Sequence, residues 1–414
     1  MGRISLGQLI AAATIDGVDV VGVRPGRGLV GTLEGAYRRA VRHGQTVVSS
    51  AEVLRRGVLR VPELRQFPPP WSRDWRQRGD LIDDDPPWQR SRLFPAFDQQ
   101  VAVFADGALR EAAHLGGPGV AVFSPLVRHA VYEAVHEASR RDGVPAGVRH
   151  LLAAIFAEPG NAAAQLARQM WVVGHDGLAL DRQAPKYRAG DDPPDWAPQA
   201  LKALCVLPSN APRMLQPPWS AAVAAGLYVA MRRPFLRHGA RYGHPILALV
   251  EHDAGIQAIR LGHAHTGTVE LLLSVLDLHE QLHTAGAVLP EPVARHNTAG
   301  QILREHGVTL LAATMAAAQS APALQPVPDP AAVPTKGWPR ERKTRRPTPP
   351  LDAGALRALR SASTAARQAR DPFAGTTHLL VTMLRDGDDP AAGLLRRIGA
   401  NPETIAGHAS TSQG

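Results

Sequence analysis

The chain has 414 residues, 44% of them hydrophobic and 20% charged, a composition typical of a folded protein with two or three domains. No apolar run of about 18 residues occurs, which excludes a membrane-spanning helix, and the N-terminus lacks the long apolar core of a secretory signal. The single cysteine, Cys205, cannot form an internal disulfide and lies in an apolar run. A reducing cytoplasm is therefore the expected location.

The formal net charge of +9 is compatible with nucleic-acid binding, but no motif supports that function. The densest basic run, Lys336–Arg346, lies in a proline-rich segment typical of a solvated linker. It can hold phosphates only nonspecifically, and no zinc finger or aromatic platform accompanies it. Nucleic acid is therefore not an expected partner.

The first predicted element is a helical hairpin over Leu33–Leu59, in which His43-Gly44 closes the first helix. Ser49 or Ser50 supplies the hydroxyl that caps the second helix. A proline- and tryptophan-rich insertion, residues 61–97, follows the hairpin. Such a long irregular stretch predicts a surface excursion or a binding loop.

A second, clearer hairpin is predicted over Phe123–Met170. Its first helix presents a smooth face of alanines spaced four apart: Ala130, Ala134 and Ala138. Gly147 precedes the second helix, and Pro159-Gly160-Asn161 turns the chain into a third helix over Ala162–Met170. A polar, proline-rich linker is then expected over residues 181–218.

The clearest hairpin lies at Leu249–Leu276, where apolar residues recur at helical spacing and Gly262 ends the first helix. Thr268 is placed to cap the second helix, and Glu270 lies in its first turn, where the helix dipole favours an anion. A basic, proline-rich linker over 321–350 leads to a fourth hairpin, Leu351–Ile405. There Gly375-Thr376-Thr377-His378-Leu379-Leu380 repeats the same pattern.

The recurring pattern is an alanine-bearing helix, Leu-Gly-His, a short turn and then Gly-Thr-x-x-Leu-Leu-Leu. It resembles the repeat of the Clp N-terminal domain, the small all-helical module at the front of Clp-type protein unfoldases. The resemblance implies an all-α fold of four such repeats, expected in two pairs because each unit must bury its apolar stripe against another. The expected domains are 1–180 (the first pair with its insertion), 219–320 and 351–414, joined by linkers at 181–218 and 321–350.

No Gly-Lys pair occurs in the sequence, so a Walker-type phosphate-binding loop is absent from it. The chain is thus similar to a Clp repeat protein that lacks the ATPase modules. The resemblance implies a noncatalytic bacterial protein that binds a protein or peptide, such as a Clp unfoldase, its adaptor or its substrate. Its expected role is an adaptor, regulator or decoy in Clp-dependent proteolysis, with no catalytic, cofactor-binding or metal-ligating residue.

One departure from the family concerns phosphorylated arginine, which some members recognise through a glutamate directly after Gly-Thr. The matching positions here hold no acid: Ala51, Arg149, Val269 and Thr377. Recognition of that mark is therefore not expected. The next position holds His150 or His378 in two copies, and both histidines are predicted to pack beside the buried leucines.

An enzymatic alternative comes from His279-Glu280-Gln281-Leu282-His283, which fits H-E-x-x-H. On a helix this spacing places two imidazoles on one face to bind zinc, with the glutamate as general base. The third histidine of the metzincin spacing is absent, because Leu289 occupies its position. A zinc-dependent metallohydrolase therefore remains the second hypothesis.

Overall fold

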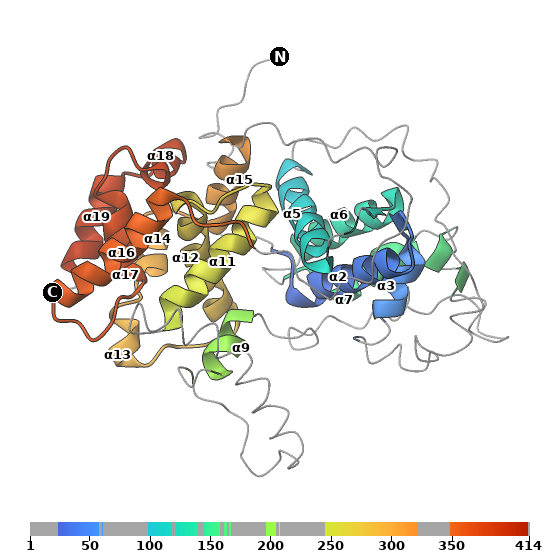
Figure 1. The fold of residues 1–414 in the computed structure, drawn as a ribbon, viewed down its shortest axis with the longest axis horizontal. Coiled ribbons are helices and arrows are strands. Elements are labelled where there is room, and N and C mark those ends of the chain that lie inside the picture. The colour runs from blue at the N-terminus through green and yellow to red at the C-terminus, as the bar shows by residue number, and fades with distance from the viewer. Residues whose placement is uncertain are drawn as a thin grey trace, which may run out of the picture. The chain divides into compact units, whose positions relative to one another are not determined.

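The fold was analysed in a computed structural model, which describes residues 24–57, 60, 98–117, 119, 121–139, 145–157, 161–163, 165–166, 196–203, 207, 245–320 and 348–412. These residues form two compact units (Figure 1). The N-terminal unit comprises the described residues from 24 to 166, and the C-terminal unit comprises those from 196 onward. The predicted all-α fold is confirmed, since the described strands are two residues long. The insertion at 61–97 and the segment 321–347 lie outside the described residues.

The N-terminal unit contains two helical hairpins that hold each other through short parallel bridges. Its elements are α2 (Arg27–Arg42), β1 (Val47–Val48), α3 (Ser50–Gly57), α5 (Asp98–Gly116), β2 (Val122–Phe123), α6 (Pro125–Ser139) and α7 (Val148–Ala157). β1, which precedes α3, pairs in parallel with β2, which precedes α6. Pro25, before α2, bridges Ala146, before α7. The segment before the first helix of each hairpin thus pairs with the segment before the second helix of the other.

The C-terminal unit repeats this bridging between its own hairpins. Its helices are α9 (Trp196–Ala203), α11 (Pro245–Leu261), α12 (Thr268–Thr284), α13 (Glu291–Ala294), α14 (Ala299–Glu305), α15 (Leu310–Ser320), α16 (Ala353–Gln368), α17 (Thr376–Leu384), α18 (Pro390–Arg397) and α19 (Pro402–Thr411). The amide of Thr266 donates to Pro350 O at 2.8 Å, and the amide of Asp352 donates to Thr266 O at 2.9 Å. The entry to α12 is therefore joined to the entry to α16.

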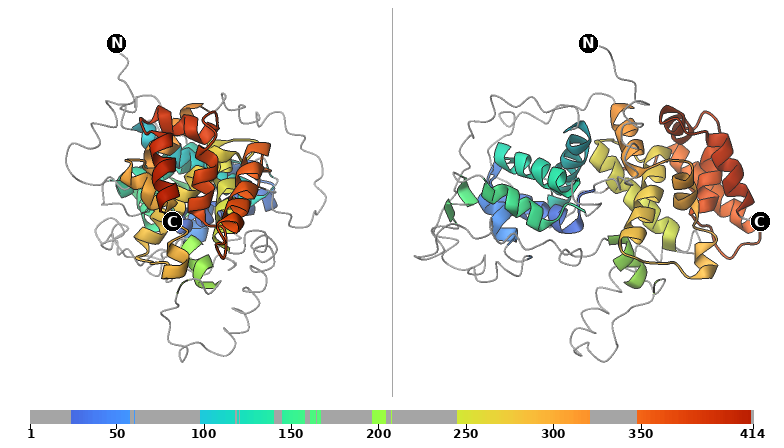
Figure 2. Two further views of the ribbon diagram at one scale, coloured as in Figure 1. Left: turned by 90° about the vertical axis from the view of Figure 1, so that its left-hand side faces the viewer. Right: turned by 180° about the vertical axis from the view of Figure 1, so that it is seen from behind.

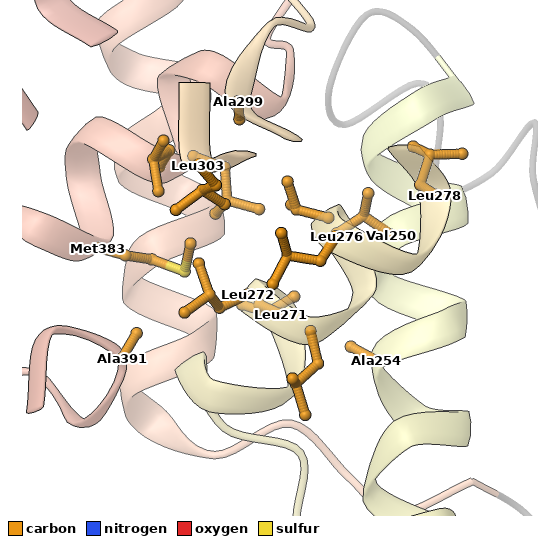
Figure 3. Close-up of a cluster of buried hydrophobic side chains, with 14 of the residues drawn as sticks. Val250, Ala254, Leu271, Leu272, Leu276, Leu278, Ala299, Leu303, Met383 and Ala391 are labelled. Atoms are coloured by element: carbon orange, nitrogen blue, oxygen red, sulfur yellow. The ribbon is translucent and has the colours of Figure 1, made fainter. Parts of the chain in front are cut away.

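Helix α12 lies at the centre of the C-terminal unit, in contact with α9, α11 and α14–α18. Leu271, Leu272 and Leu276 point away from α12 on several sides, and Leu272 lies toward Met383 of α17 (Figure 3). Both further views show α16–α19 against α11–α15 (Figure 2). The two hairpins, although far apart in sequence, therefore share one core.

Helix α9 lies inside the segment 181–218 that the sequence predicts to be a linker. It packs against α12, and the backbone amide of Ala197 donates to Gln281 Oε1 at 3.0 Å. Leu201 is fully buried in the same core as α12. At least residues 196–203 therefore belong to the C-terminal unit, and the predicted linker is shorter than 181–218.

The first helices of three hairpins end in the same hydrogen-bonded turn, with a residue of positive φ one or two positions after the last helical residue. After α2 and α11 that residue is glycine, Gly44 at φ 69° and Gly262 at φ 77°. After α16 it is Arg370, at φ 62°. The amide of Arg370 bonds to Arg367 O and that of Asp371 to Ala366 O, the pattern of a Schellman motif. A residue that carries a Cβ atom is strained in this conformation, whereas glycine is not.

We expect Arg370→Gly to stabilise the C-terminal unit by about 1 kcal/mol, because it relieves this strain and the exposed arginine loses little packing. The measurement is urea unfolding of the full chain followed by circular dichroism. The reverse substitution at the matching position, Gly262→Ala, is expected to destabilise by a similar amount. If both variants changed the free energy of unfolding in the same direction, the inferred strain at Arg370 would be contradicted.

Candidate functional site

The second helix of three hairpins begins with the same local contact, in which the third helical residue accepts a hydrogen bond from the glycine before the helix. Gly267 N–H donates to Glu270 Oε2 at 2.6 Å, and Gly375 N–H donates to His378 Nδ1 at 3.2 Å. In the N-terminal unit Gly147 N–H donates to His150 Nδ1 at 3.1 Å. The two histidines are buried, as predicted, and they also satisfy a backbone donor that the helix itself leaves open.

The capping residue pairs with the residue seven positions earlier, and the order of histidine and carboxylate is reversed between the two C-terminal hairpins. His263 Nδ1 lies 2.6 Å from Glu270 Oε1, whereas Asp371 Oδ2 lies 2.9 Å from His378 Nε2. Because His378 Nδ1 accepts from Gly375, its proton lies on Nε2 and is donated to Asp371. Each pair thus links the end of the first helix to the start of the second.

The chain at 296–298 covers the N-terminus of α17 and occupies its free donors. Thr377 N–H donates to His296 O at 3.1 Å, and Thr376 N–H donates to Asn297 Oδ1 at 3.0 Å. The Thr377 hydroxyl is 3.0 Å from the backbone nitrogen of Thr298 and is fully buried. Thr377, one of the four positions compared above with a glutamate, thus contacts the chain itself in the structure.

His296, Asp371 and His378 form a cluster in this region. Their possible ligand atoms, imidazole nitrogens and a carboxylate oxygen, lie within 4.8 Å of one another. A search of the described residues for three or more histidine, cysteine or carboxylate side chains that could hold a metal ion finds this group. Burial, as the largest cause, lowers the pKa of His296, opposed by the Asp371 charge. The sequence alone does not predict this cluster, because His296 lies far from the other two residues in sequence and matches no repeat motif. The seven-residue spacing of Asp371 and His378 was the available signal.

The H-E-x-x-H residues do not form such a cluster in the described part of the chain. His279 lies against Gly300 of α14, where a Cβ atom would approach the His279 Cβ to 2.4 Å. Burial, then the charges of Arg304 and His283, lower the pKa of His279 to about 4. Glu280 is buried and His283 is exposed. Within the described ranges, no third histidine, cysteine or carboxylate joins the two histidines in the arrangement that zinc requires.

A pair of carboxylates joins α11 to α12. Gln257 Nε2 donates to Asp253 Oδ2 at 3.2 Å and to Asp277 Oδ2 at 3.0 Å, and Arg260 Nη1 lies 3.4 Å from Asp277 Oδ2. Burial, then the charge of Asp277, raise the pKa of Asp253 to about 7. The sequence signal was Asp277, an acid on the apolar face of its helix.

We expect Asp253→Asn to change how stability depends on pH. A carboxyl whose folded-state pKa is raised stabilises the fold fully below its unfolded pKa, and this contribution is lost as the pH rises through about 7. The wild-type chain should therefore lose stability relative to Asp253→Asn between about pH 4 and pH 8. Urea unfolding across this range measures the difference in the free energy of unfolding between the two chains. A difference that is constant with pH would contradict the raised pKa of Asp253.

The described helices include none with the length and hydropathy needed to cross a bilayer. Fold and site together define an all-helical protein whose hairpins are paired through bridges at the helix entries. Residues 351–411, which comprise α16–α19, match the family model of the Clp repeat (R) N-terminal domain. The predicted resemblance to that family is thus confirmed for this segment. A comparison with curated proteins found no match.

Proposed function

We propose that the chain is a noncatalytic protein- or peptide-binding module that acts as an adaptor, regulator or decoy in Clp-dependent proteolysis. The observation that carries this proposal is the match of residues 351–411 to the Clp repeat N-terminal domain. The number of repeats, four, is part of the same proposal. It is supported by the hairpins of the two units, which are bridged in the same way.

A basic surface of the matched segment suggests where a partner binds. The exposed face of α16 carries Arg357, Arg360 and Arg367, and the helix contains no acidic residue. Exposed arginines attract acidic segments and form bidentate bonds with carboxylates. We therefore place the contact with an acidic partner segment on α16.

The test is degradation of a fluorescent substrate by a purified Clp unfoldase and its peptidase, with and without the full chain. An adaptor raises the degradation rate, a decoy lowers it, and direct binding to the unfoldase is measured by light scattering. The variant Arg357→Glu/Arg360→Glu should weaken either effect, whereas Arg385→Glu/Arg397→Glu, which reverses two exposed arginines elsewhere in the segment, should not. No binding and no change in rate would contradict the proposal.

The zinc-hydrolase alternative has no support among the described residues, because His279 and His283 belong to no three-ligand group. It is therefore not proposed.

A further inference from the structure

The cluster at the entry to α17 combines three side chains from three separate segments. His296 follows α13, Asp371 follows α16, and His378 lies in the first turn of α17. The exposed fractions of the three side chains are 2%, 10% and 1%. Two imidazoles and one carboxylate removed from water in this way are a donor set that zinc and related divalent metals prefer.

Two of the distances within the cluster lie near the separation expected around one ion, and all three ligand atoms lie within 4.8 Å of one another. Asp371 Oδ2 lies 2.9 Å from His378 Nε2 and 3.8 Å from His296 Nδ1. Ligand atoms around a tetrahedral zinc ion with bonds of roughly 2.0 Å lie about 3.3 Å apart. The two observed separations bracket that value, so shifts of a few tenths of an ångström bring both into range.

An independent observation is that His296 Nδ1 is buried and has no hydrogen-bond partner among the residues that the structure describes. At 3.8 Å from Asp371, the nitrogen is too far for a hydrogen bond. A buried polar atom without a partner is costly, and it is rare in a well-packed region. A metal ion between His296 and Asp371 would satisfy it.

We propose that His296, Asp371 and His378 bind one divalent metal ion of the zinc class, through Nδ1, a carboxylate oxygen and Nε2. The fourth position is left for water or for an atom of a partner. In the metal-free state Nε2 of His378 carries the proton that Asp371 accepts. Binding through Nε2 must therefore move this proton to Nδ1, at the expense of the Gly375 hydrogen bond. Metal affinity falls as the pH falls.

The other C-terminal hairpin provides an internal comparison. Its pair, His263 and Glu270, joins the same two helix ends with a hydrogen bond of 2.6 Å, and the described part of the chain adds no third ligand to it. Two residues are thus sufficient to connect the helices. The third ligand, His296, comes from the long connection between α12 and α14, whose counterpart between α17 and α18 is only residues 385–389.

The test is zinc binding by the full chain after treatment with a chelator, by isothermal titration calorimetry and by elemental analysis. We expect about one tightly bound ion, and at least about tenfold weaker binding in His296→Ala and in Asp371→Asn. Asp371→Asn keeps an oxygen that can accept from His378, so the helix connection is retained. Zinc should raise the melting temperature of the wild-type chain and not that of His296→Ala.

The matched control is His279→Ala/His283→Ala, which removes the other histidine pair and should leave zinc affinity unchanged. Absence of tight zinc binding, or its loss in the control and not in His296→Ala, would overturn the proposal. Because these measurements need no partner protein, they are independent of the degradation test.

Discussion

Gly375→Ala is expected to destabilise the C-terminal unit by about 3 kcal/mol or more. A Cβ atom at Gly375 would lie 1.9 Å from the carbonyl oxygen of His296. That oxygen belongs to the backbone and accepts a hydrogen bond from Thr377 N–H. It therefore cannot move away without breaking this hydrogen bond at the N-terminus of α17. The φ of Gly375 is −111°, which any residue adopts, so the effect is steric and not conformational.

Thermal unfolding of the full chain by circular dichroism measures this effect, and hydrogen exchange of α17 localises it. Gly267→Ala is the matched comparison, because its Cβ would meet the movable Asp352 side chain, with Oδ2 at 2.9 Å. Gly267→Ala should therefore destabilise the C-terminal unit less than Gly375→Ala does. Gly393→Ala, in α18, has no atom within 4 Å of the new Cβ and should stabilise by up to about 1 kcal/mol. A Gly375→Ala chain as stable as Gly267→Ala would rule out the close approach.

Leu272→Ala is expected to destabilise the same unit by about 2–5 kcal/mol. Leu272 is 0% exposed and lies between its own helix pair and Met383 of the other hairpin (Figure 3). The substitution removes buried apolar surface and leaves a cavity that the rigid helices fill only in part. Urea unfolding with hydrogen exchange should show protection lost in both α12 and α17, since the two helices share one core.

The control for this prediction is Val288→Ala, because Val288 is 81% exposed and its truncation should change stability by less than about 0.5 kcal/mol. If Leu272→Ala reduced protection in α11 and α12 and left α17 unchanged, the hairpins would be independent units and the shared core would be refuted.

The second helices could be predicted from the sequence because local chemistry determines them. Glycine before a threonine, an acceptor three residues into the helix and a run of leucines specify the start and buried face of α12, whatever the partner helix is. The fourth hairpin follows the same rule with His378 in place of Glu270. The structure places glycine at the N-cap of both helices, Gly267 and Gly375, so Thr268, predicted as a cap, is instead the first helical residue.

The candidate metal site could not be predicted in this way, because it depends on tertiary contacts. His296 reaches Asp371 only when the connection after α13 lies over the entry to α17. The H-E-x-x-H motif, by contrast, is complete within one helix, yet Gly300 of α14 packs against its first histidine. Helix α9 was missed because prolines on either side made its segment resemble a linker.

The bridge between the entries to α12 and α16 has a consequence for fragment complementation. Backbone bonds from Thr266 to Pro350 and Asp352, together with the shared leucines, hold the two hairpins without using the covalent connection between them. Two separately synthesised pieces, one ending after α15 and one beginning before α16, therefore contain complementary surfaces. They should reassemble into the same unit when they are mixed.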